Sequence, residues 1–188
     1  IPYIFLGAIF PVMSRFHKTS TDYLKLLYSK SAYYLVLLGL PMAVGIALAA
    51  SQIIAILYPA EFSKAVPALQ ILIWAEFFIF LNFLAGYLLN SINRAALFSL
   101  STAVTAVVNI FLNFILISNF SLVGAAIATL ISQILSLLLL NWFAARSGYA
   151  FKDFGRLWKP VISSMVMGAV IILLSNLSLF LIIPFAVI

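Results

Sequence analysis

The sequence has no cysteine, a single histidine and few charged residues. The absence of cysteine excludes disulfides, thiolate metal sites and cysteine nucleophiles. His17 is the one histidine, so a Ser-His-Asp arrangement has a single candidate base and a site with several histidine metal ligands is excluded. Charged residues make up 7% of the chain, against about 25% in an ordinary soluble domain. A chain with so little charge is unable to cover its apolar surface in water, and this excludes a soluble fold.

Apolar residues dominate instead, at 66% of the chain with a mean hydropathy of +1.25. The net charge of +6 is basic, but the basic residues fall between apolar runs and form no solvated face. Binding to nucleic acid needs such a face and is therefore not expected. The sequence also contains no Walker A loop, no GxGxxG motif and no HExxH motif. We therefore expect neither an enzyme nor a cofactor, and no ATP-driven transport by this chain alone.

Turn residues and charges divide the chain into apolar segments of membrane length. We predict a partial span and five complete spans, at 1–13, 31–58, 67–92, 95–118, 122–145 and 160–183. About 20 apolar residues cross the ~30 Å hydrocarbon core as a helix, and helices satisfy their backbone hydrogen bonds within lipid. The segment 1–13 is too short to cross, so we expect the tail of a preceding helix. The predicted fold is all-α: one polytopic transmembrane bundle over 1–188, as a fragment of a larger protein.

The positions of lysine and arginine predict the orientation of these spans. Nine of the ten basic residues fall in three alternate predicted loops, 14–30, 93–94 and 146–159, and Lys64 alone falls on the other side. The nine are Arg15, Lys18, Lys25, Lys30, Arg94, Arg146, Lys152, Arg156 and Lys159. Because cytoplasmic loops of membrane proteins collect lysine and arginine, we predict that these three segments face the cytoplasm.

Glu76 stands out because it lies well inside the 67–92 span with no basic residue near it in sequence. A charged side chain at this depth costs at least ~2.5–3.5 kcal/mol on insertion scales and often marks an ion or substrate path. A protonated glutamic acid bonded to a neighbouring helix is an equally good explanation. The sequence leaves both open.

A polar stripe follows the 95–118 span, where Ser101, Thr105, Asn109 and Asn113 recur every four residues. This spacing places them on one helical face, which must meet protein or water. The stripe either lines a hydrophilic cavity for a sugar or phosphate headgroup or joins helices through hydrogen bonds. Four members are more than helix joining usually needs, and we therefore predict a substrate path that includes Glu76 and this stripe.

A second stripe, on the 122–145 span, consists of small residues at the same spacing: Gly124, Ala128, Ser132 and Ser136. Small residues four apart allow two helix backbones to approach closely in a membrane. We therefore predict that this face packs against a neighbouring helix.

The same region carries a resemblance to a known family. The stretch 107–117, VVNIFLNFILI, followed by 123–129, VGAAIAT, resembles the polysaccharide-exporting (Wzx-like) flippases. Three further stretches are similar to the same family: PVMSR at 11–15, LYPAEF at 57–62 and ALQIL at 68–72. These flippases belong to the MATE/MOP superfamily, together with multidrug exporters and the lipid II flippase.

The resemblance implies a protein of 12 to 14 helices in two lobes, of which this chain would be most of the second lobe. It implies export of a polyprenyl-diphosphate-linked oligosaccharide across the cytoplasmic membrane by alternating access, coupled to an ion such as H⁺ or Na⁺. The partners would then be this substrate, membrane lipids and the missing N-terminal lobe. An ion-coupled multidrug exporter is the alternative. A membrane-embedded biosynthetic enzyme is less consistent with outer loops of about eight and four residues, because catalytic groups of such enzymes usually occupy larger loops.

Overall fold

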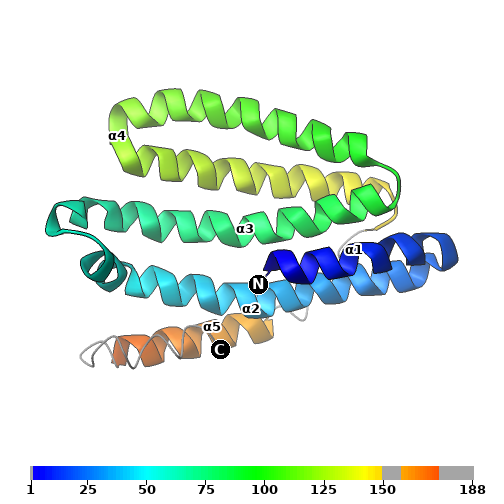
Figure 1. The fold of residues 1–188 in the computed structure, drawn as a ribbon, viewed down its shortest axis with the longest axis horizontal. Coiled ribbons are helices and arrows are strands. Elements are labelled where there is room, and N and C mark those ends of the chain that lie inside the picture. Colours follow the sequence, from blue (N-terminus) through cyan, green and yellow to red (C-terminus); the bar gives the residue numbers. More distant parts are fainter. Residues whose placement is uncertain (1, 150–157, 174–188) are drawn as a thin grey trace.

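The computed structural model describes residues 2–149 and 158–173, and within these ranges it contains helices and no strand. The elements are α1 (Pro2–Thr19), α2 (Thr21–Leu57), the 3₁₀ helix η1 (Ala60–Ala65), α3 (Val66–Ser91), α4 (Ala95–Arg146) and α5 (Trp158–Leu173) (Figure 1). The all-α helix bundle predicted from the sequence is therefore confirmed.

Helix α3 lies at the centre of the bundle. It packs against α4 on one side and α2 on the other, while α5 packs against α2 and α1 contacts both α2 and α3. Figure 1 shows α5, α2, α3 and α4 following one another as layers of roughly parallel rods. This order leaves α4 free to form one outer side of the molecule.

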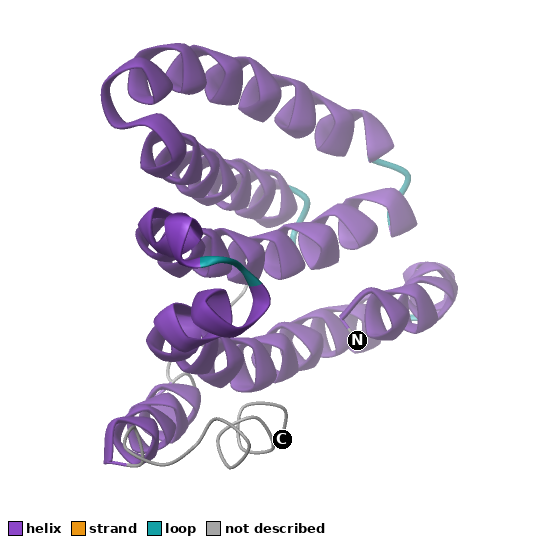
Figure 2. Ribbon diagram, turned by 60° about the vertical axis from the view of Figure 1, so that its left-hand side comes forward, coloured by secondary structure: helices purple, strands orange, loops and turns teal. Residues whose placement is uncertain are grey.

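Helix α4 is a hairpin of two antiparallel arms. Its 52 residues bend back at Ser121, whose backbone angles (φ 51°, ψ −126°) are not helical. The two arms, 95–120 and 122–146, are here called the outgoing arm and the return arm. At 1.5 Å per residue each arm is about 38 Å long, enough to cross a bilayer. The return arm lies between the outgoing arm and α3 in both views (Figures 1 and 2).

The long helices have the character of membrane spans. Within the described ranges, three helical segments are long and apolar enough to cross a membrane: Thr21–Leu57, Ala60–Ser91 and Ala95–Arg146. In their most apolar windows only 28–33% of the residues are buried inside the bundle. Apolar side chains therefore point outward along most of their length, as they do where the solvent is lipid. The chain is a multi-pass membrane protein.

The predicted loop at 14–30 is wrong, because this segment is helical. Helix α1 continues to Thr19, α2 begins at Thr21, and Ser20 alone separates them. No glycine or proline occurs between residues 14 and 30. Each helix therefore continues beyond the apolar region as far as the break at Ser20. The result is a helical elbow that carries Arg15 and Lys30 on exposed positions.

Local sequence explains where the helices end. Tyr58 precedes Pro59 and adopts an extended backbone (φ −133°), because proline disfavours the helical conformation in the residue before it. Asn93 follows α3 with a left-handed backbone (φ 59°), and the Arg94 amide donates to the Leu89 carbonyl at 2.8 Å. This six-residue bond defines a Schellman end. It turns the chain sharply into α4.

The elbow, the 92–94 turn and the end of α4 lie at one end of the bundle, here called the elbow end (Figure 1). A buried apolar cluster joins them, with Met13 and Leu24 from the elbow, Leu88 from α3 and Ala144 from α4. The Tyr28 hydroxyl donates to Asn141 Oδ1 at 3.3 Å and links α2 to the return arm. The elbow end is therefore closed by packed side chains.

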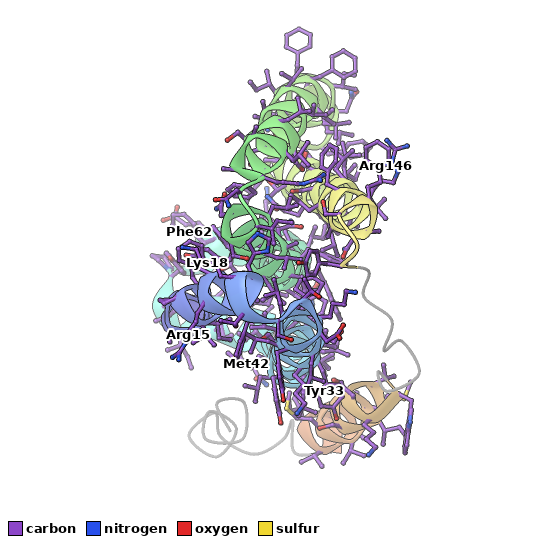
Figure 3. The ribbon with its side chains drawn as sticks, turned by 90° about the vertical axis from the view of Figure 1, so that its right-hand side faces the viewer. Arg15, Lys18, Tyr33, Met42, Phe62 and Arg146 are labelled. Atoms are coloured by element: carbon purple, nitrogen blue, oxygen red, sulfur yellow. The ribbon has the colours of Figure 1, made fainter. Side chains whose placement is uncertain are left out.

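Most of the lysine and arginine residues in the described ranges belong to the elbow, the 92–94 turn or the end of α4. Figure 3 looks along the bundle from the elbow end and shows Arg15 and Lys18 projecting from α1 on one flank and Arg146 projecting from α4 on another. Lys64 lies in η1 at the opposite end. The predicted segment 146–159 and the last predicted span, 160–183, extend into 150–157 and 174–183, outside the described residues. The facing of the elbow end toward the cytoplasm stays a prediction.

Candidate functional site

A pocket of about 500 Å³ lies between α3 and the two arms of α4. We call it the α3–α4 pocket. Its lining consists of Ile79, Asn82, Phe83, Phe98, Thr102, Thr105, Ala106, Asn109, Thr129, Ser132, Gln133 and Ser136. Within the described ranges the lining contains amides, hydroxyls and apolar groups but no charged side chain. Polar groups between membrane-length helices must find partners inside the protein, because lipid offers them none.

Two amide side chains join α3 to the return arm in this pocket. Asn82 Nδ2 donates to Gln133 Oε1 at 2.8 Å and to the Gln133 backbone carbonyl at 3.1 Å. Asn82 is only 7% exposed, and its Oδ1 atom is buried without a hydrogen-bond partner. Buried polar atoms without partners are uncommon in folded proteins. The pair therefore combines a fixed contact with an unused acceptor.

The sequence of α3 explains why α4 comes so close to Asn82. Ala75 and Gly86 lie about two turns before and one turn after Asn82 and are both buried. A Cβ at Gly86 would lie 2.8 Å from Cδ2 of the Phe98 ring, so the ring occupies the space that a side chain would need. Small residues on a helix face allow close approach of a neighbouring helix, and Gly86 leaves room for the Phe98 ring of the outgoing arm.

The polar stripe of the outgoing arm packs against the small-residue stripe of the return arm. Asn109 Nδ2 donates to Ser132 Oγ at 3.1 Å, and Ser132 Oγ donates to the Ala128 carbonyl at 2.7 Å. Asn113 Nδ2 donates to Asn109 Oδ1 at 2.9 Å. The two asparagines thus use amide groups to connect the arms and each other. This is the hydrogen-bonded joining of helices that the sequence left as the alternative to a cavity wall.

The stripe nevertheless also reaches the pocket. Thr105 and Asn109 line it, and Ser132 and Ser136 line it from the other arm. Ser101 is fully buried away from the pocket lining, and its hydroxyl, like that of Thr105, has no partner. Half of the predicted path residues of this stripe therefore contribute to the cavity. The assignment of all five residues to a substrate path stays a prediction.

The four small residues of the return arm are all buried. The arms approach each other closely near the hairpin bend, where a Cβ on Gly124 would overlap the Leu116 carbonyl group and lie 2.9 Å from the Ile117 nitrogen. Ala128 is fully buried one turn further along the return arm. These positions have the burial that close helix packing requires.

Glu76 lies on α3 outside the pocket lining. Its side chain is half-buried. Within residues 2–149 and 158–173 no lysine or arginine forms an ion pair with it. The structure therefore does not bring Glu76 together with the polar stripe, and its proposed role in an ion or substrate path stays a prediction.

The arrangement offers little to a tightly held metal ion. In the part of the chain that the structure describes, no group of three or more His, Cys, Asp or Glu side chains could hold one. The oxygen atoms at the pocket are neutral amides and hydroxyls, which suit hydrogen bonding or a weakly held hard cation.

Asn82 and Gln133 are the site residues that the sequence reasoning missed. Each is an amide inside an apolar span, and such residues often bond across helices. The missing signal was a longer repeat, because Asn82 has no polar side chain four positions away and Gln133 has only Thr129.

Comparisons with known proteins agree with this architecture. A curated relative, the probable low-salt glycan biosynthesis flippase Agl15 of Haloferax volcanii, is 27% identical over 166 residues, covering 88% of this chain and 35% of that protein. The uncharacterized membrane protein MJ1068 of Methanocaldococcus jannaschii is 30% identical over 110 residues, covering 58% of this chain and 22% of that protein. The chain thus spans about a third or less of the length of these relatives. The lipid II flippase MurJ family matches residues 3–188, and the chain therefore belongs to this family.

Proposed function

We propose that the chain is part of a flippase that moves a polyprenyl-diphosphate-linked oligosaccharide across the cytoplasmic membrane for cell-surface polysaccharide synthesis. The observation that carries the proposal is the family match over 3–188. A pocket between membrane-length helices, whose lining includes amides and hydroxyls, supports it. The relative whose name describes a glycan biosynthesis flippase supports the same substrate class. The narrower resemblance to the polysaccharide-exporting branch is part of this proposal.

In the proposed mechanism the chain forms a second lobe that works with a preceding lobe by alternating access. The tightly packed hairpin of α4 and the closed elbow end would move as rigid units, since packed cores change between discrete arrangements and do not deform continuously. The α3–α4 pocket would offer hydrogen bonds to a polar part of the substrate, so that this part crosses the membrane without leaving polar surroundings.

Coupling to H⁺ or Na⁺ is the remaining element of the proposal. Glu76 is the one acidic residue of the 67–92 span, and it is the candidate residue for ion coupling. A flippase of this kind performs transport and breaks no bond, which agrees with the expectation that the chain is not an enzyme.

The alternative is an ion-coupled exporter of amphipathic drugs, and reconstitution distinguishes the two. The full-length protein in liposomes should translocate a fluorescent polyprenyl diphosphate carrying a short sugar, measured as loss of fluorescence on adding an impermeant quencher. A drug exporter would leave this probe unmoved and would instead accumulate an amphipathic dye. Failure to move the glycolipid under H⁺ and Na⁺ gradients of either direction would refute the proposal.

A further inference from the structure

We infer that the α3–α4 pocket receives an uncharged hydrogen-bonding group, the sugar of a lipid-linked glycan, and not the diphosphate. This inference rests on the proposed function and names the part of the substrate that this lobe contacts. The residues that carry it are Asn82 and Gln133, which join α3 to the return arm at the pocket.

The charge of the pocket argues against the diphosphate. All twelve residues that line it within the described ranges are neutral, and Glu76, the acidic residue of α3, does not line it. Moving an ionised group from water into an apolar environment without a counter-charge costs far more free energy than moving a neutral polar group. A diphosphate in this pocket would meet no lysine or arginine among the described residues.

The hydrogen-bonding groups of the pocket are mixed, as a sugar requires. Gln133 accepts from Asn82 through Oε1, which leaves its Nε2 group as a donor. Asn82 donates through Nδ2 and leaves Oδ1 as an acceptor without a partner. The Thr105 hydroxyl, also without a partner, is able to donate and accept. An ionised phosphate oxygen only accepts hydrogen bonds, whereas sugar hydroxyl and acetamido groups both donate and accept them.

The burial of these groups shows that they belong to a built site. Asn82 and Thr105 are 7% and 8% exposed, and their free oxygens are shielded from bulk water. A ligand that pairs with these atoms removes an unfavourable state once the pocket wall moves to admit it, because a polar atom that stays buried and unpaired destabilises the protein. The pocket volume of about 500 Å³ lies within the range of about 300–1,000 Å³ typical of small-molecule sites, and its Phe83 and Phe98 walls are also typical.

The test compares two probes on the full-length protein in lipid nanodiscs. One probe is a polyprenyl diphosphate carrying a single N-acetylhexosamine, and the other is the same polyprenyl diphosphate without sugar. Native mass spectrometry gives the ratio of their dissociation constants. We expect the sugar to improve binding about tenfold in the wild type, as one or two well-placed hydrogen bonds do.

Gln133→Leu should bring this ratio close to one. Gln133→Glu keeps an acceptor for Asn82 Nδ2 but removes the Nε2 donor, so the ratio should fall even if the leucine variant folds poorly. Gln70→Leu is the matched control, because Gln70 donates to the Ala47 carbonyl outside the pocket and its loss should leave the ratio unchanged.

Equal binding of both probes by the wild type would overturn the inference, and so would a sugar preference that survives both Gln133 substitutions. Transport assays on the same preparations separate this result from the proposed function. A protein that flips the glycolipid without any sugar preference refutes the inference alone. A protein that keeps the Gln133-dependent preference but flips nothing refutes the proposed function and leaves the sugar site standing.

Discussion

Gly124→Ala should destabilise the protein by forcing the two arms of α4 apart near their bend. The added Cβ would overlap the Leu116 carbonyl group and would stand 2.9 Å from the Ile117 nitrogen. Ordinary contacts of a Cβ are 3.4–4 Å, and both partners here are helix backbone, which is unable to rotate away as a side chain does. Overpacking of this kind costs up to about 3 kcal/mol, and the better helix propensity of alanine returns up to about 1 kcal/mol. We expect a net loss of about 2 kcal/mol.

Gly7→Ala is the matched control for this prediction. Gly7 lies inside α1 with no atom within 4 Å of the position that a Cβ would take, so alanine should leave stability unchanged or raise it by up to about 1 kcal/mol. Unfolding by sodium dodecyl sulfate in mixed micelles, followed by circular dichroism, measures both variants against the wild type. The reasoning is refuted if Gly124→Ala is as stable as Gly7→Ala, because the arms would then be able to separate at no cost.

Four other predictions concern the hairpin bend, the packed face of the return arm, the orientation in the membrane and Glu76. Ser121→Gly should stabilise the protein by about 0.5–1 kcal/mol in the same assay, because Ser121 occupies a backbone conformation (φ 51°) that glycine adopts without strain; a destabilised variant would show that the serine side chain is needed at the bend. Ala128→Leu should lower the melting temperature in detergent, since Ala128 is fully buried in the packed face of the return arm, and an unchanged melting curve would mean that this face looks toward lipid. Cysteines placed singly at Ser20 and Ser147 should resist an impermeant thiol reagent in intact cells while cysteine at Ser63 reacts, and external labelling of Ser147→Cys would reverse the predicted orientation. Glu76→Gln should impair glycan export in complementation at normal membrane abundance, whereas export that falls only in parallel with abundance would assign Glu76 a structural role.

The fold class followed from the sequence because lipid leaves few alternatives. A chain with 66% hydrophobic residues and 7% charge satisfies its backbone in a membrane by forming helices, and the apolar runs are long enough to cross it. Residues close to the helix ends also predicted where several helices begin and end. Pro59 stops α2, and Asn93 with Arg94 turns α3 into α4, because these effects act within a few residues of the backbone.

The elbow shows where such local reading failed. The cluster of charges at 14–30 indicated a loop, but charge excludes a segment from the hydrocarbon and does not break a helix. Helices α1 and α2 therefore continue beyond the apolar region and meet at Ser20. Only packing at the elbow end, where Met13 and Leu24 are fully buried, fixes how the two helices meet.

The sequence predicted which residues of the candidate site share a helix face, but it did not predict which residues touch each other. Four-residue spacing alone put Ser101, Thr105, Asn109 and Asn113 on one side of a helix, and it did the same for Gly124, Ala128, Ser132 and Ser136. Periodicity says which residues share a face and nothing about what that face meets. The tertiary structure decided that the two stripes meet each other through the Asn109–Ser132 bond. It also brought Asn82 of α3 to Gln133, 51 residues away, since that contact depends on how three helices pack together.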